Sequence, residues 1–305
     1  GPLPTYEQVL NDPRFDGQRS LTVLAVDDDF HTAYSWQGSI GVQRQLGNTM
    51  AFEVDFVNQS GRRMAYMRNA NLTYDPSTGA NYPLSNASRR VNPDWVTVTR
   101  LFTDGWSEYR ALTTTFTKTF SDRWQASATY TLSGSWDAEG SPDVGFEVAK
   151  DLGGDYTLAA NDQRHRAVFN AVWQLPGGFQ LSGLYFYGSG LRYFTQYGAD
   201  LRDRGATNPA DGGAQPGRLR PDGTIMPRNN FVGLPLHRVD MRFLKQFTIG
   251  PMKIDGMVEV FNLFNHANYG SYVTVESNPR YGQPQQNTTV SYQPRVGQLG
   301  FRVTF

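Results

Sequence analysis

The side chains in this sequence with the most chemical potential are four histidines and one run of three aspartates. The histidines have neither the spacing of metal ligands nor that of a nucleophile and its base, so we expect loop or rim residues. They are His31, His165, His237 and His266. No other pattern supports catalysis, and we expect no enzyme activity and no cofactor.

The aspartate run is a weak candidate for binding a hard cation such as calcium. Calcium loops normally alternate their ligands with spacer residues and include a glycine turn, whereas Asp27, Asp28 and Asp29 are consecutive. A solvated acidic loop tip explains the run better, so we expect no bound metal.

The amino-acid composition excludes several classes of protein and of site. Among the 305 residues there is no cysteine, which excludes disulfides, thiolate metal sites and cysteine nucleophiles. Basic and acidic residues number 28 each, so a broad nucleic-acid-binding surface is not expected. No run of about 18 apolar residues occurs, and therefore no membrane-spanning helix is predicted. The 31 glycines and the aromatic share of 13% are less ordinary.

The dominant pattern is alternation of apolar and polar residues with a period of two, which is typical of strands with unlike faces. Between residues 123 and 133, Trp124, Ala126 and Tyr130 share one face, while Gln125 and Thr129 share the other. We count about nine such strands, with a tenth at 21–26 as an alternative. The nine cover residues 36–44, 50–56, 106–120, 123–133, 166–174, 179–187, 238–247, 253–260 and 298–305.

Short and long connections alternate along these strands. The short turns, at 45–48, 121–122, 176–178 and 249–251, are rich in Gly, Pro, Asn and Asp. The long loops, at about 61–104, 137–163, 191–236 and 265–291, are uncommon in a compact soluble domain. A transmembrane β-barrel explains them, because its short turns face the periplasm and its long loops face outside. A secreted β-sandwich is the alternative, with less reason to gather its long loops at one end.

Aromatic residues fall near the ends of the predicted strands, where a barrel wall meets lipid headgroups. They are Trp36, Trp106, Phe120, Trp124, Trp136, Trp173, Phe179, Tyr185, Tyr187, Phe247 and Phe305.

The polar face of these strands carries ten charged residues that would point into the barrel. Such charges need water or a partner, because burial of an unpaired charge is costly. Cross-strand pairing around a hydrated lumen is one solution. The ten are Glu53, Asp55, Arg166, Arg238, Asp240, Arg242, Lys253, Asp255, Glu259 and Arg302.

Several segments resemble the C-terminal barrel half of TonB-dependent outer-membrane receptors, and most closely the Oar-like subgroup. The best marks are Gln43-Arg-Gln-Leu46, Asn262-Leu-Phe-Asn265 and the terminal Phe305, within similar stretches at 35–63, 107–133, 162–190 and 258–270. The resemblance implies a barrel of 22 strands around a plug domain, which the ten charges would contact, and an inner-membrane energy-coupling protein as a partner. It also implies that Phe305 is the aromatic end read by the barrel-assembly machinery.

We therefore expect an all-β protein of the bacterial outer membrane, in contact with lipid and not with nucleic acid. Residues 1–30 would form an N-terminal segment, and 31–305 an antiparallel meander of nine or ten strands. As the C-terminal portion of a nutrient receptor, the meander would be a curved open sheet with two unpaired edges. The alternative is a small, self-closed barrel of about ten strands whose long loops bind partners.

Overall fold

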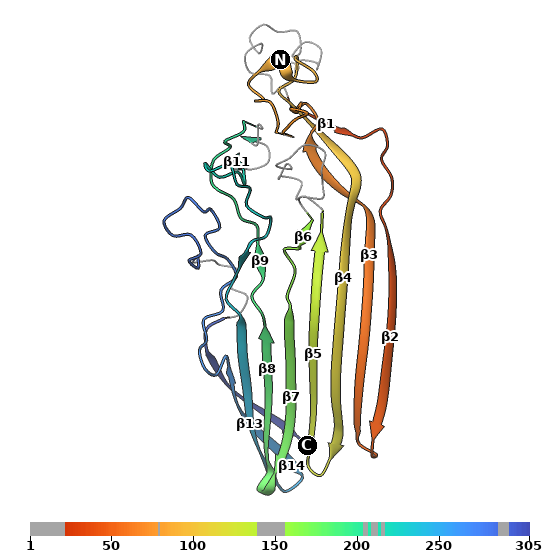
Figure 1. Ribbon diagram of the computed structural model, residues 1–305. Coiled ribbons are helices and arrows are strands. Elements are labelled where there is room, and N and C mark those ends of the chain that lie inside the picture. The colour runs from red at the N-terminus through yellow and green to blue at the C-terminus, as the bar shows by residue number, and fades with distance from the viewer. Residues whose placement is uncertain are drawn as a thin grey trace, which may run out of the picture.

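The main feature of the fold is a tall, curved β-sheet (Figure 1). A computed structural model describes residues 22–78, 80–138, 156–203, 207–208, 213–214, 217–285 and 293–305. Within these ranges nine strands form an antiparallel meander, in which each strand pairs with the next one of the set. They are β2 (Tyr34–Leu46), β3 (Met50–Asn69), β4 (Thr97–Ser121), β5 (Trp124–Asp137), β7 (His165–Leu175), β8 (Phe179–Gly188), β13 (Leu236–Ile249), β14 (Met252–Phe261) and β15 (Val296–Thr304).

The predicted meander is confirmed, with two corrections. The first loop was predicted too long, because β3 continues to Asn69 and β4 begins at Thr97. The possible tenth strand forms as β1 (Thr22–Val26), but it lies parallel to the start of β4, outside the meander. The alternation rule missed the strand extensions because a β-bulge at Arg62 to Met64 shifts the face that each residue occupies.

Four short turns lie together on one rim of the sheet, at the bottom of Figure 1, as predicted. They need left-handed backbone, which explains their composition. Asp122 and Arg123 have φ of 51° and 70° between β4 and β5, and Gly250 has φ of 58° between β13 and β14. The η4 turn (Pro176–Gly178) joins β7 to β8, with φ of 75° at Gly177. We call this side the short-turn rim and the opposite side the long-loop rim.

The pairing register places apolar side chains on one face of the sheet and polar side chains on the other. Phe56 lies between Ile40 and Leu112, and Leu112 is opposite Leu132, so one transverse row of four strands is wholly apolar. The adjacent row on the other face contains Thr113 and Thr131, whose hydroxyl groups hydrogen-bond at 3.2 Å. The apolar face is exposed in this structure: Phe169 is 45% and Phe243 42% exposed.

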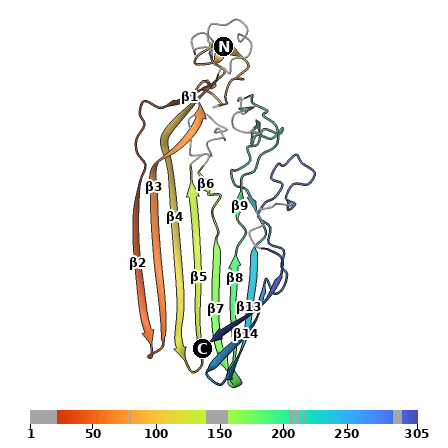
Figure 2. The ribbon, with the colours of Figure 1, turned by 180° about the vertical axis from the view of Figure 1, so that it is seen from behind.

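The described sheet does not close on itself. Its order ends at β2 on one side and β15 on the other, and no pairing joins them. Since eight antiparallel steps separate these strands, β2 and β15 run in the same direction, toward the short-turn rim (Figures 1 and 2). The self-closed small barrel kept as an alternative is therefore not the arrangement observed.

The described connections at the long-loop rim have their own structure. They include β6 (Thr157–Leu158), β9 (Arg192–Tyr193), β10 (Thr207–Asn208), β11 (Gly213–Ala214), β12 (Phe231–Val232) and the η2 turn (Ala87–Arg89). β9 pairs with β12, and Tyr272 packs against Tyr193 and Phe231 with ring centroids 5.1 Å apart in each pair. Arg220 binds both carboxylate oxygens of Glu276, at 2.6 and 3.1 Å. These contacts tie the loop before β13 to the loop after β14.

Among the residues that the structure describes, no helix has the length and apolar character needed to span a membrane.

Candidate functional site

The polar face of the sheet carries all ten of the predicted charged residues. The pairing register shows this directly: Arg242 is opposite Glu259, Asp255 is opposite Arg302, and Glu53 lies in the row of Thr115. The charges are unevenly distributed, because most of them lie on β13 and β14 while β4 and β5 present mainly threonine and serine.

An ion-pair ladder on β13 and β14 holds four of these charges. Arg238 Nε donates to both carboxylate oxygens of Asp240, at 2.8 and 2.9 Å. Arg242 Nε lies 3.1 Å from Glu259 Oε1. The side chains of Asp240 and Glu259 are only 14% and 18% exposed, so their arginine partners offset much of the cost of desolvation.

Further polar pairs extend the ladder across to β15 and along β13 and β14 toward the short-turn rim. Gln298 on β15 donates to Glu259, and Gln246 donates to Asp255 at 2.9 Å. Lys253 lies opposite Thr304 in the last rows before the turn. A polar seam therefore runs along the last three strands of the described sheet.

The remaining predicted charges lie apart from this ladder. Asp55 projects across Gly41 of β2, where a Cβ would lie 2.0 Å from Asp55 Oδ1, so a larger residue at position 41 would require that carboxylate to move. Arg166 Cζ lies 5.6 Å from the ring centroid of Phe186. The structure thus groups the charges of β13 and β14 but leaves those of β3 and β7 separate.

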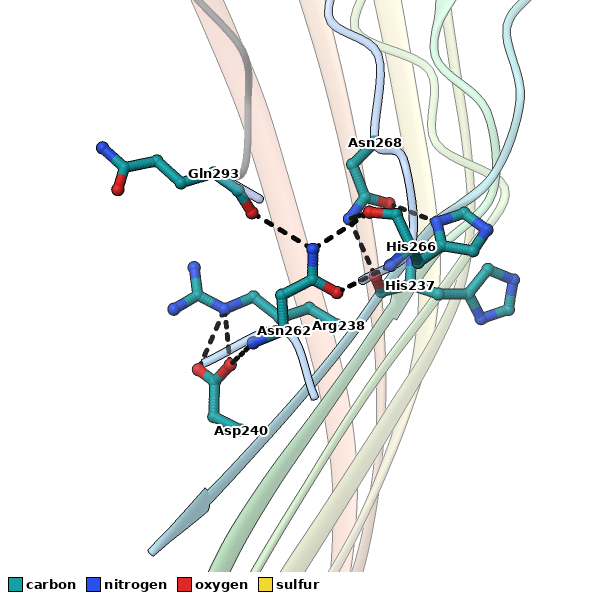
Figure 3. A network of polar contacts seen from close by, with 7 residues as sticks. All are labelled: His237, Arg238, Asp240, Asn262, His266, Asn268 and Gln293. Carbon is teal, nitrogen blue, oxygen red and sulfur yellow. Dashed lines mark hydrogen bonds and ion pairs between the residues drawn. The ribbon is translucent and has the colours of Figure 1, made fainter. Parts of the chain in front are cut away.

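A polar staple, made by Asn262 and Asn268, lies where β14 ends and was not predicted (Figure 3). Asn262 Nδ2 donates to the carbonyl oxygens of His266 and Gln293, at 3.0 and 3.1 Å. Its Oδ1 accepts from His266 N at 3.0 Å, and its backbone N–H donates to Asp240. Asn262 is 2% exposed and has φ of 50°, a conformation that asparagine tolerates better than most residues.

Asn268 completes the staple by hydrogen-bonding to the backbone at the start of β13. Its Oδ1 accepts from His237 N, and its Nδ2 donates to His237 O, both at 2.8 Å. The two asparagines therefore connect the end of β14 to the start of β13 and to the approach of β15. The sequence did contain a signal: Asn262 and Asn265, φ 53°, are the two ends of the motif that carried the resemblance.

A second feature that the sequence did not predict is Lys118, a buried cation on the apolar face. Its Nζ donates to Ser121 O at 2.9 Å and to Trp124 O at 3.2 Å, and it lies 4.2 Å from the Trp124 ring centroid. The charge therefore reaches the backbone of the short turn while its aliphatic stem covers apolar surface. Its residue type alone gives no sign of this position.

The aspartate run lies at the edge of an open groove of about 670 Å³ near the long-loop rim. Asp27 Oδ2 pairs with Arg100 at 3.3 Å, and its Oδ1 accepts from Asp29 N. His31 Nδ1 contacts Asp29 O at 2.7 Å. In the described part of the chain, no three or more His, Cys, Asp or Glu side chains are grouped as metal ligands would be.

The terminal Phe305 follows β15 at the short-turn rim and is 97% exposed. Its predicted role as an assembly signal remains a prediction.

The single-layer meander, the apolar outer rows and the alternating turns define the wall of a transmembrane β-barrel. The chain belongs to the family described as outer membrane beta barrel domain, whose model matches residues 1–298. It is therefore a protein of the bacterial outer membrane. No curated protein sequence matches the chain.

Solved structures that match include outer-membrane transporters and receptors, each with 12% sequence identity and a TM-score of 0.49. The outer membrane transporter YddB from Escherichia coli is matched over 80% of this chain and 30% of its own. For the ferric preacinetobactin receptor BauA from Acinetobacter baumannii the shares are 88% and 29%, and for the FrpB iron transporter from Neisseria meningitidis 91% and 32%. The chain spans about a third of the length of these proteins.

Proposed function

We propose that this chain is part of the barrel wall of a TonB-dependent outer-membrane receptor, which takes up a scarce nutrient too large for porins. The observation that carries the proposal is the open meander: among the described residues, β2 and β15 are unpaired edges on a sheet whose apolar face suits lipid. Unpaired backbone groups are not stable in hydrocarbon, so further strands must complete the wall. The motifs shared with TonB-dependent receptors support that class.

The strand directions restrict how the wall is completed. Since β2 and β15 are parallel to each other, an antiparallel closure needs an odd number of additional strands. The 22 strands implied by the resemblance satisfy this condition. A nine-stranded closure would require β2 and β15 to pair in parallel, which bacterial single-chain barrels of even strand number do not do.

The polar seam on β13 and β14 would line the lumen and contact a plug domain. Its arginines and carboxylates already pair within the wall, so a plug would meet charges whose desolvation is largely offset and could add charge-assisted hydrogen bonds to them. The inner-membrane energy-coupling protein would act on that plug, and the barrel-assembly machinery would read Phe305.

Uptake measurements test the proposal in cells that make the complete protein. A strain without the gene is compared with the complemented strain for growth and accumulation of individual large or chelated nutrients, with and without a protonophore. The expected result is that accumulation of one nutrient requires the protein and stops with the protonophore. Uptake that persists with the protonophore, or no dependence on the gene for any nutrient, would contradict the proposal.

A further inference from the structure

An aromatic and basic patch interrupts the apolar face of β2 to β5 near the long-loop rim. It consists of Arg62, Arg63, Arg110, Glu108, Tyr34, Trp36, Trp106 and Trp136. Within this set three guanidinium groups oppose one carboxylate, and the carboxylate of Asp104 lines the same groove as Arg62 and Arg63. We call it the rim patch.

The register places the rim patch directly above the apolar rows. The last apolar row contains Ile40, Phe56, Leu112 and Leu132. The next row contains Arg110, the following one Trp36, Glu108 and Trp136, and the one after that Tyr34, Arg62 and Trp106. Aromatic residues at such a boundary are typical of the headgroup level, so these arginines lie where lipid phosphates are found.

A β-bulge is what brings two consecutive arginines to the same face. Neighbouring residues of a regular strand point to opposite faces, but the register shifts after Arg62, and Arg63 has φ of 58°. Arg63 Cζ consequently lies 5.6 Å from the ring centroid of Tyr34, the residue that pairs with Arg62.

The contacts that Arg62 and Arg110 make within the protein leave some of their N–H donors available for a ligand. Glu108 holds Arg110 NH2 at 3.1 Å and Arg62 NH2 at 3.7 Å, so one carboxylate positions two guanidinium groups. The side chains of Arg62 and Arg110 are 40% and 58% exposed, and each has five N–H donors. Trp136 lies over Gly134, where a Cβ would be 2.3 Å from its Cη2, and Gly134 is the residue that pairs with Arg110.

We infer that the rim patch binds the phosphate-bearing headgroup of a lipid in the outer leaflet. Guanidinium groups bind phosphate through paired hydrogen bonds, and the flanking rings fit the level between headgroup and acyl chain. The inference rests on the proposed orientation, with the apolar face toward lipid. The rim patch adjoins the open groove, because Tyr34, Arg62, Arg63, Trp106 and Glu108 also line it. The other acidic residues of the groove are Asp104, beside Gly105, and Asp27 and Asp29, which are level with residues 101–103 of β4, farther toward the long-loop rim.

The test titrates the complete protein, in detergent, with lipid A, a glycolipid with two phosphates, and counts bound lipid by native mass spectrometry. The Arg62→Gln/Arg110→Gln variant should bind lipid A about 25-fold more weakly, on the basis of roughly fivefold per arginine. The Arg89→Gln/Arg280→Gln variant removes the same charge from two exposed loop residues outside the patch and should bind like the wild type. Folding of each variant is checked by its resistance to heat on a gel.

Two further arms separate lipid binding from other causes. Dephosphorylated lipid A should bind equally and weakly to all variants, and inorganic phosphate at millimolar concentration should not compete. The inference is overturned if the control variant loses as much affinity as the patch variant, if the patch variant binds normally, or if inorganic phosphate displaces the lipid. Failure of nutrient uptake would contradict the proposed function without changing these results.

Discussion

The two faces of this sheet belong to the same strands and yet have opposite compositions. On β5, Ala126, Ala128 and Leu132 point to the apolar face, and Ser127 and Thr131 point to the polar one. In a soluble sandwich the apolar face would be covered by a second sheet, but here Phe169 and Phe243 remain 45% and 42% exposed. The difference indicates a wall between two solvents, with lipid outside and water inside.

Each face also contains residues of the opposite character. Lys118 on the apolar face carries its charge to the carbonyl oxygens of the short turn, and Arg62 and Arg110 lie above the last apolar row. On the polar face, Phe186 contacts Arg166. These exceptions lie near a rim or are matched to a specific partner, whereas Val168 and Val172 place further apolar side chains on the polar face of β7.

The largest expected effect comes from a charge placed at mid-height on the apolar face. Phe169→Arg should lower the free energy of unfolding of the complete barrel in lipid by about 2–4 kcal/mol, because the guanidinium would enter hydrocarbon. Thr129→Arg, one strand away on the polar face, should be tolerated. Chemical denaturation in lipid vesicles measures both, and equal losses would contradict the assignment of the faces.

Removal of the staple should have the next largest effect. Asn262→Ala removes three side-chain hydrogen bonds and places alanine at φ of 50°, so we expect a loss of about 2 kcal/mol in stability. Asn262→Gly removes the same hydrogen bonds but tolerates the backbone conformation, and should lose less. Hydrogen exchange at His266 should increase in both variants; unchanged protection would show that the staple does not hold the loop.

A smaller effect is expected for the threonine ladder on the polar face. The hydrogen bond between Thr113 and Thr131 should contribute about 0.2–1 kcal/mol, as other cross-strand pairs do. A double-mutant cycle with Thr113→Val and Thr131→Val measures this coupling. A coupling above about 1 kcal/mol would mean that this face is drier than a hydrated lumen.

The smallest effect concerns a loop in water, outside both faces. The side-chain hydrogen bond from Ser77, followed by the backbone hydrogen bond from its N–H, lowers the pKa of Asp75 below its usual range. Because the folded pKa is depressed, this turn is stabilised above the unfolded pKa of about 4 and loses that stabilisation as pH falls through the lower folded value. The protection factors of the Ser77 and Thr78 amides, which are corrected for the pH dependence of intrinsic exchange, should therefore fall only in acid, and Asp75→Asn should abolish that fall.

Much of the wall could be predicted from the sequence, because alternation and turn composition are local signals. They identified nine strands, the short turns and the face of each charge. The signals were lost at the bulge near Arg63, where alternation shifts. They indicated the possible strand at 21–26 but not its parallel pairing with β4, which lies far away in sequence. The staple and the Lys118 site depend on three-dimensional neighbours such as Gln293 and Trp124, which spacing alone cannot bring together.

The central claim, that one face meets lipid and the other water, is tested most directly by accessibility along β5. This chain has no cysteine, so single cysteines placed at positions 125 to 132 of the complete protein can be spin-labelled specifically once any cysteine outside these 305 residues is replaced. Collision with oxygen, which partitions into lipid, should peak at positions 126, 128, 130 and 132, and collision with a water-soluble nickel chelate at 125, 127, 129 and 131. Two profiles with opposite phase are predicted. Profiles in phase with each other, or without a period of two, would contradict the account.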